Sequence, residues 1–265
     1  MKVLCILLAM LILTTVCLLS PAFAAPQGAT LAGLRTELMQ LKGRAPSVVV
    51  RRVLSYREGE ETLLLSASRR GDVALIEKLA QTLPDSRVFQ QKDSFKRNAF
   101  HWAADYNTAL ALMKTYSRLR LHEGAPQEDV FDSRAFRTAL MNAGDLRGET
   151  PLMYQVKARR YEVAFLYLTK NADLCRKAVS GETAVHLLVR QCTGHSPEAL
   201  TLLARFLHGE PYVVFLRDGA GRTPLELAKE LRARLAYEKI KERPKPQNRN
   251  GIAFFFQFFG GFYGG

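Results

Sequence analysis

The sequence has few cysteines and a shortage of acidic residues. Four Cys occur in 265 residues, and 25 Asp and Glu stand against 38 Lys and Arg, which gives a net charge of +13. So few cysteines exclude a small domain held together by disulfides. Hydrophobic residues make up 48% of the chain, an ordinary share for a protein that buries a core. Disorder throughout the chain and a polytopic membrane protein are therefore both excluded.

Recognisable catalytic and metal-binding motifs are also missing. The sequence holds no C-x-x-C, H-x-x-x-H, Walker-type loop or G-x-S-x-G elbow, so neither a zinc site nor a nucleotide or hydrolase site is indicated. Cys192 precedes His195 by three residues, but no third group orients the two for nucleophilic catalysis. We predict no enzymatic activity, no metal and no cofactor. A hydrolase hidden in residues 119–144 is an alternative without a visible nucleophile–base pair.

The first residues have the pattern of a secretory signal peptide. Lys2 is followed by an apolar run from Val3 to Leu19, and small residues stand at Ala22 and Ala24. This pattern predicts a signal peptide over residues 1–24, cleaved after Ala24, and an exported protein that is periplasmic or secreted. Its removal would leave 37 basic and 25 acidic residues, a net charge of +12. An uncleaved signal anchor and a lipoprotein modified at Cys17 remain alternatives.

A phrase of about eight residues recurs along the middle of the chain. Residues 148–152 read GETPL and residues 181–185 read GETAV, a shift of 33. Residues 218–225 read DGAGRTPL, and Thr183 to Thr223 is 40 residues, or 33 plus a seven-residue insertion placed at Cys192–Glu198. Residues 62–68 and 98–104 fall on the same template. A fixed period of this length is the sequence signature of a stacked-repeat architecture.

The repeated phrase resembles the ankyrin repeat, whose pattern is D-x-x-G-x-T-P-L-H-x-A-A-x-x-G. Matching positions fall in five units over residues 57–243: Thr62, Leu64, Ala67, Gly71, Ile76 and Leu79; Asp93, Phe100, His101, Ala103, Ala104 and Leu112; Asp145, Gly148, Thr150, Pro151, Leu152 and Asn171-Ala172-Asp173; Gly181, Thr183 and His186; Asp218, Gly221, Thr223, Pro224, Leu225 and Ala228. The resemblance implies an all-α, ankyrin-like helical solenoid of about five helix-turn-helix repeats with short β-hairpin tips.

Several local expectations follow. Pro151 and Pro224 should begin helices that the preceding Thr caps. The apolar spacing of residues 75–79 and 199–207 predicts the second helices of two units. The resemblance implies that His101 and His186 hydrogen-bond within the fold. Between Asn98 and Thr150 the spacing exceeds one period by 19 residues, which predicts an insertion over about 119–144 with a loop and an extra helix, or a degenerate repeat, near 130–142.

The regions outside the repeats have their own patterns. Residues 25–56 should form an N-terminal helical cap, because Leu31, Leu34, Leu38 and Leu41 are spaced amphipathically. Residues 244–265 read as a basic linker and a Phe/Gly-rich tail, for which disorder, docking onto the last repeat, membrane-interface insertion and an oligomer contact remain open. Cys175 and Cys192 should lie at opposite ends of a repeat, which favours two free thiols over a disulfide.

The resemblance implies that a partner meets the hairpin tips and the exposed ends of the first helices. The candidate binding residues in this register are Arg69, Arg70, Arg97, Tyr106, Arg147, Lys157, Arg190 and Arg222. Acidic residues intrude at Glu61, Asp105, Glu149 and Glu182, so the face should be mixed but mildly basic. We predict a non-enzymatic scaffold for protein–protein interaction, with an acidic protein as the sharper hypothesis for the partner.

The main alternative is a peripheral membrane or cell-envelope protein. Residues 35–57 hold six Lys and Arg against one Glu, and residues 229–249 hold eight against three. These basic flanks and the aromatic tail would suit an anionic membrane surface. No nucleic acid is expected as a partner, because export would separate the protein from it.

Overall fold

The computed structural model describes residues 30–127, 130–131, 133, 136–194 and 196–242, and these are all-helical. Helices take up 61% of the described residues, which contain no β-strand. The predicted signal peptide, residues 1–24, and the linker and tail, residues 244–265, lie outside the described residues. No helix of the described part is long and apolar enough to cross a membrane.

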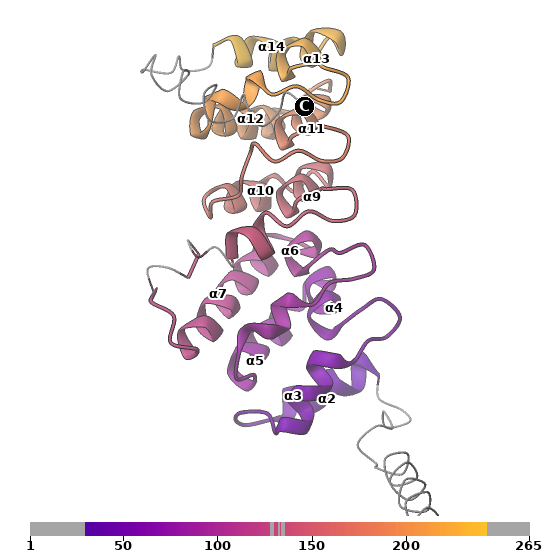
Figure 1. The fold of residues 1–265 in the computed structure, drawn as a ribbon, viewed down its shortest axis with the longest axis vertical. Helices are drawn as coiled ribbons and strands as arrows, with labels where there is room; N and C mark the ends of the chain where they lie inside the picture. The colour runs from indigo at the N-terminus through magenta and orange to yellow at the C-terminus, as the bar shows by residue number, and fades with distance from the viewer. Residues whose placement is uncertain (1–29, 128–129, 132, 134–135, 195, 243–265) are drawn as a thin grey trace, which may run out of the picture.

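Helices follow one another as antiparallel pairs after two initial helices, α2 (Leu31–Gln40) and α3 (Ser47–Ser55) (Figure 1). The pairs are α4 (Leu63–Arg70) with α5 (Val73–Thr82), α6 (Ala99–Trp102) with α7 (Tyr106–His122), α9 (Pro151–Lys157) with α10 (Tyr161–Leu168), α11 (Ala184–Gln191) with α12 (Pro197–Gly209), and α13 (Pro224–Glu230) with α14 (Arg234–Lys241). Three short helices lie between them: η1 (Ser86–Gln90), the π-helix η3 (Arg137–Met141) and η4 (Pro211–Phe215).

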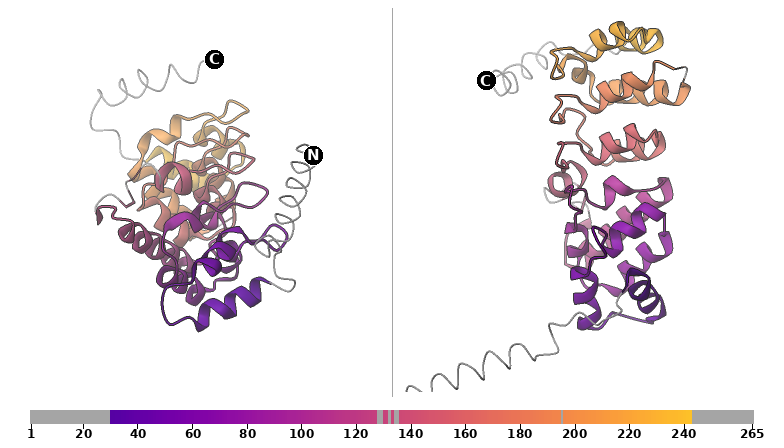
Figure 2. Two further views of the ribbon diagram at one scale, coloured as in Figure 1. Left: turned by 60° about the horizontal axis from the view of Figure 1, so that its bottom comes forward. Right: turned by 90° about the vertical axis from the view of Figure 1, so that its right-hand side faces the viewer.

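The pairs stack in chain order and form two layers. The first helices α4, α6, α9, α11 and α13 contact one another in succession, and so do the second helices α5, α7, α10, α12 and α14. Figure 2 shows the successive levels from the side. The amphipathic segment at the start becomes α2, which buries Leu31, Leu34 and Leu38 and contacts α4 and α5. Each level therefore covers the apolar face of its neighbours.

The predicted helix starts are confirmed. Pro151 and Pro224 are the first residues of α9 and α13, and the hydroxyls of Thr150 and Thr223 accept the backbone N–H of the residue three positions on. Proline suits this position because its missing N–H would be unpaired in the first turn anyway. The apolar residues predicted for two second helices are also buried, in α5 and α12.

The insertion between the second and third pairs differs from the prediction. Helix α7 continues to His122, because Leu112, Tyr116 and Leu119 keep the helical spacing and are all buried. The extra helix expected near 130–142 is reduced to the short π-helix η3. Phe136, just before η3, packs edge-on against Phe100 with ring centroids 5.8 Å apart. The insertion thus adds Phe136 to the aromatic core, and it adds no further helix pair among the described residues.

The β-hairpin tips expected between the units are absent from the described residues. The short β-hairpins do not appear as strands, since the described residues contain one isolated bridge, between Glu58 and Glu61; tight turns replace them.

Cys175 and Cys192 are free thiols, the former half-buried and the latter buried. Burial raises the pKa of both thiols, to about 12 for Cys175 and about 11 for Cys192. Neither thiol is therefore activated as a nucleophile.

Candidate interaction surface

Three of the turns that precede first helices are built around an aspartate. Asp93, Asp145 and Asp218 each use Oδ1 to accept two backbone N–H groups, two and four residues further on, at 2.8–2.9 Å. The backbone N–H of each aspartate also donates to the carbonyl four residues on, at 2.9–3.0 Å. One carboxylate thus fixes the whole turn, which makes the turn a rigid platform.

Left-handed residues close these turns. Lys96, Gly148, Gly181 and Gly221 have φ of 63°, 70°, 76° and 77°. At Gly181 glycine is also required for space, because a Cβ there would lie 2.3 Å from the backbone nitrogen of Gly219. Neighbouring turns therefore make direct backbone-to-backbone contact at this glycine.

Backbone hydrogen bonds join one turn to the next along the stack. The N–H of Leu146 donates to the carbonyl of Phe95 at 2.9 Å, that of Val179 to Arg147 at 2.8 Å, and that of Gly219 to Ser180 at 2.9 Å. Figure 1 shows the turns projecting from the same side of the stack. Four consecutive turns are thereby tied into one ladder, so their side chains keep fixed spacings.

The turn ladder carries apolar side chains that face solvent. Phe95 is 45% exposed, Leu146 53% and Val179 81%, one in each of three consecutive turns, and the exposed Ala220 follows in the fourth. We call these four residues the tip row. Exposed apolar side chains in a row on rigid backbone are typical of an interaction surface.

The basic residues predicted at the helix ends are mostly paired within their own unit. Arg69 pairs with Glu61, Lys157 with Glu149 at 2.7 Å, and Arg190 with Glu182 at 2.7 Å. In the last unit the signs are reversed, since Arg222 pairs with Glu230 at 2.9 Å. Every one of these pairs joins residues eight apart. The face beside the tip row is thus largely neutral, and less basic than a count of its arginines suggests.

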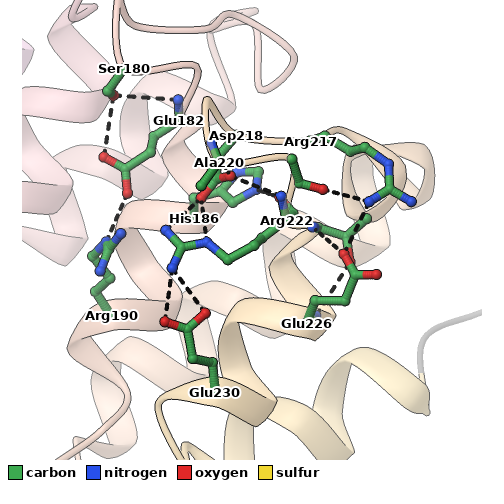
Figure 3. A network of polar contacts seen from close by, with 12 residues as sticks. Ser180, Glu182, His186, Arg190, Arg217, Asp218, Ala220, Arg222, Glu226 and Glu230 are labelled. Carbon is green, nitrogen blue, oxygen red and sulfur yellow. Dashed lines mark hydrogen bonds and ion pairs between the residues drawn. The ribbon is translucent and has the colours of Figure 1, made fainter.

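Arg222 is the centre of a polar network at the last turn (Figure 3). Its guanidinium donates to Asp218 Oδ2 and to both carboxylate oxygens of Glu230, at 2.9–3.0 Å. Burial alone would raise the pKa of Asp218, but hydrogen bonds from Arg222 and Ala220 outweigh it and hold that pKa below its usual value. Arg222 therefore fixes the turn and is already fully engaged.

Arg97 has the same role in the second unit and is even less accessible. Its side chain is 16% exposed and pairs at 2.7 Å with Asp93, which is 5% exposed. The guanidinium lies 4.2 Å from the ring centre of Trp102 and donates to the hydroxyl of Tyr154 at 3.0 Å. We therefore assign Arg97 to the framework between two units.

Three of the predicted residues are exposed and take part in no ion pair within the described residues. Arg70, Tyr106 and Arg147 are exposed, and no ion pair of the described residues involves either arginine. Arg147 stands next to Leu146 in the tip row. Like Lys96, which is exposed next to Phe95, it is a cation directly beside a tip-row residue.

The two repeat histidines hydrogen-bond within the fold, as expected. The ring of His101 lies 2.9 Å from Asn98 Oδ1 and 3.1 Å from the carbonyl of Glu149. His186 lies 2.9 Å from Thr183 Oγ1 and 3.1 Å from the carbonyl of Arg222. Burial lowers the pKa of both rings, to about 4 for His101. Each neutral ring thus links its helix to the next turn.

Neither the comparison with protein-family models nor the search of curated proteins gives a match for the chain. Within the described residues no group of three His, Cys, Asp or Glu is placed to hold a metal ion.

The basic flanks are partly neutralised as well. In the N-terminal flank Arg35 pairs with Asp72 at 2.6 Å and Arg52 with Glu37 at 2.7 Å, while Arg57 donates to the carbonyl of Lys92. Half of the six basic residues of this flank are thus engaged internally. The C-terminal flank continues beyond residue 242 and so lies partly outside the described residues.

The tip row was not among the predicted residues. Comparison of the repeats at the shift of 33 could have paired Leu146 with Val179, but Phe95 and Ala220 stand one position later in their turns. The ion pairs eight residues apart could have been found in the same way, because Glu149 and Lys157 align with Glu182 and Arg190 at the shift of 33.

Proposed function

We propose that this chain is an exported, ankyrin-like repeat protein without enzymatic activity that binds another protein through its tip row. The order of helix pairs, the repeated TPL helix starts and the structural histidines support membership of that architecture. The pattern of Lys2, the apolar run and Ala22–Ala24 supports export. The observation that carries the binding proposal is the ladder of hydrogen-bonded turns with one exposed apolar residue on each of three turns.

The chemistry of the surface defines the partner that fits it. Three large apolar side chains at fixed spacing favour a partner that offers a complementary apolar ridge. The paired charges beside the row contribute little, because exposed ion pairs are worth no more than about 1 kcal/mol. The exposed guanidinium of Arg147 favours an acidic residue on the partner opposite it.

Crosslinking in the producing cells tests this proposal. A photoreactive residue in place of Val179 should give one discrete crosslinked protein, and the same residue in place of the exposed Glu77 of α5 should not. Leu146→Asp with Val179→Asp should abolish the product of a photoreactive residue at Phe95. Val48→Asp is the matched control, since Val48 is 63% exposed on α3. Equal crosslinking in both variants would reject the tip row as the binding site.

A further inference from the structure

An apolar groove lies between the second helices α10 and α12. It encloses about 320 Å³ and is lined by Tyr161 and Phe165 from one side and by Pro197, Thr201 and Leu202 from the other. These helices belong to the layer that does not carry the turns. The groove is therefore separate from the tip row. A ligand bound in the groove would be distinct from the partner proposed for the tip row.

The rim of the groove is acidic in a chain that is basic overall. Glu162 and Glu198 both line the groove and are exposed. Glu198 accepts a hydrogen bond from Ser196 Oγ at 3.1 Å, and neither carboxylate forms an ion pair within the described residues. By contrast, Glu149 and Glu182 are each paired with a cation at 2.7 Å. Two unpaired carboxylates beside aromatic rings favour a ligand that is both apolar and cationic.

The groove already binds one cation of its own. The guanidinium of Arg205 lies 4.4 Å from the ring centre of Phe165, which shows that this ring accepts a cation on its face. Tyr161 is held by its hydroxyl, which donates to Gln191 Oε1 at 2.8 Å. The Tyr161 ring is thus fixed in orientation before any ligand binds.

The C-terminal residues of the same chain have the matching chemistry. Residues 243–265 contain three basic residues, Arg243, Lys245 and Arg249, and no acidic residue. Phenylalanines follow at 254, 255, 256, 258 and 259. Basic residues followed by aromatic rings complement an aromatic groove with an acidic rim.

The position of α14 brings these residues within reach. Helix α14 ends at Lys241 and contacts α12, which forms one wall of the groove. The path from α14 across α12 to the groove crosses about two helix diameters, or about 20 Å. The twelve residues between Lys241 and Phe254 span up to about 40 Å when extended. An intramolecular connection is therefore sterically feasible.

We propose that residues 243–259 dock in this groove of their own chain. The phenylalanine rings would cover Tyr161, Phe165 and Leu202, and the basic residues before them would face Glu162 and Glu198. The proposal does not depend on partner binding at the tip row, because the tip row lies on the turns and the groove lies between α10 and α12.

A photoreactive benzoylphenylalanine in place of Phe256 of the full-length protein tests the proposal. Irradiation of the purified protein should give crosslinks within one chain, and mass spectrometry should map them to residues 161–165 or 197–205. Glu162→Lys with Glu198→Lys should lower the yield of these crosslinks about tenfold, the loss expected for two weak ion pairs that become repulsive.

The matched control makes the same change of charge elsewhere. Glu60 and Glu77 are exposed and form no ion pair within the described residues, so Glu60→Lys with Glu77→Lys should leave the crosslinks unchanged. Circular dichroism of both double variants checks that the fold is retained. Crosslinks to other helices, covalent dimers alone, or adducts with added anionic lipid vesicles in place of groove crosslinks would each overturn the proposal.

Discussion

At the scale of single residues, the aspartate–arginine pairs decide how the turns are held. The Asp93 carboxylate accepts two backbone N–H groups and pairs with Arg97 while only 5% exposed. Removing the cation leaves that carboxylate buried without its counter-charge, which is costly. Arg97→Ala should therefore lower the free energy of unfolding by about 3 kcal/mol, measured by chemical denaturation.

Arg147 provides the control for this prediction. It is exposed, and its role in the turn ladder comes from its backbone carbonyl, which alanine retains. Arg147→Ala should change the free energy of unfolding by no more than about 0.5 kcal/mol. Similar losses in both variants would show that Arg97 is not a framework residue.

The buried ring of His101 predicts a dependence of stability on pH. Burial lowers its pKa from 6.5 to about 4, so below pH 6.5 the unfolded chain binds a proton that the folded chain does not. Stability is then fully present above pH 6.5 and is lost as the pH falls toward 4, with a slope of up to about 1.4 kcal/mol per pH unit. Denaturation curves across this window should show a shallower slope for His101→Gln.

The unchanged protein, measured at each pH under the same conditions, supplies the comparison. A slope in His101→Gln as steep as in the unchanged protein would assign the dependence to other groups.

The sequence located these residues but could not assign their partners. The register correctly placed Arg97 at a turn and His101 at the start of a helix. The framework role of Arg97 depends on Tyr154, 57 residues away, and on Trp102. Contacts between units depend on how closely two turns approach each other. The sequence pattern of one unit does not predict that distance.

At the scale of elements, the turns depend on glycine for two separable reasons. Gly181 and Gly221 have nearly the same left-handed φ, 76° and 77°, but a Cβ meets backbone 2.3 Å away at Gly181 and nothing within 4 Å at Gly221. Gly221→Ala should cost about 1 kcal/mol for the backbone conformation alone. Gly181→Ala should cost at least about 2 kcal/mol more, because two turns must separate.

Thermal and chemical denaturation of the two alanine variants measure this difference. Hydrogen exchange at Gly219, whose N–H donates to Ser180, should also accelerate in Gly181→Ala and not in Gly221→Ala. Equal stabilities would mean that the turns are loosely joined, and the rigidity of the tip row would then lack its basis.

The sequence predicts a helix most reliably where one residue type marks the start of that helix. Pro151 and Pro224 mark two helix starts because proline suits the first turn and little else in a helix. The length of α7 and the π-helix η3 were not foreseen. Leu119 continues the apolar spacing of α7 into a stretch that looked like an insertion, and Phe136 takes its position from the aromatic rings it meets.

At the scale of the whole molecule, the stack is held by contacts between consecutive levels. Phe100 illustrates this, since it packs against Phe89, Phe136 and Tyr167 from neighbouring segments, and Tyr167 donates to its carbonyl at 2.8 Å. Helix α13 contacts α11, α14 and η4, and lies two levels beyond α9. Stability in such an array is a sum of local terms, so a defect should weaken one part of the stack more than the rest.

Two core substitutions test this distribution of stability. Phe100 and Leu227 are both fully buried, and alanine at either should cost about 3–5 kcal/mol locally. Native-state hydrogen exchange of Phe100→Ala should show faster exchange in α5, α7 and α10 than in α13 and α14. Leu227→Ala should show the reverse, with α2 to α5 unaffected. Uniform acceleration in both variants would instead identify a single cooperative unit, and the tip row would then be only as stable as the weakest level.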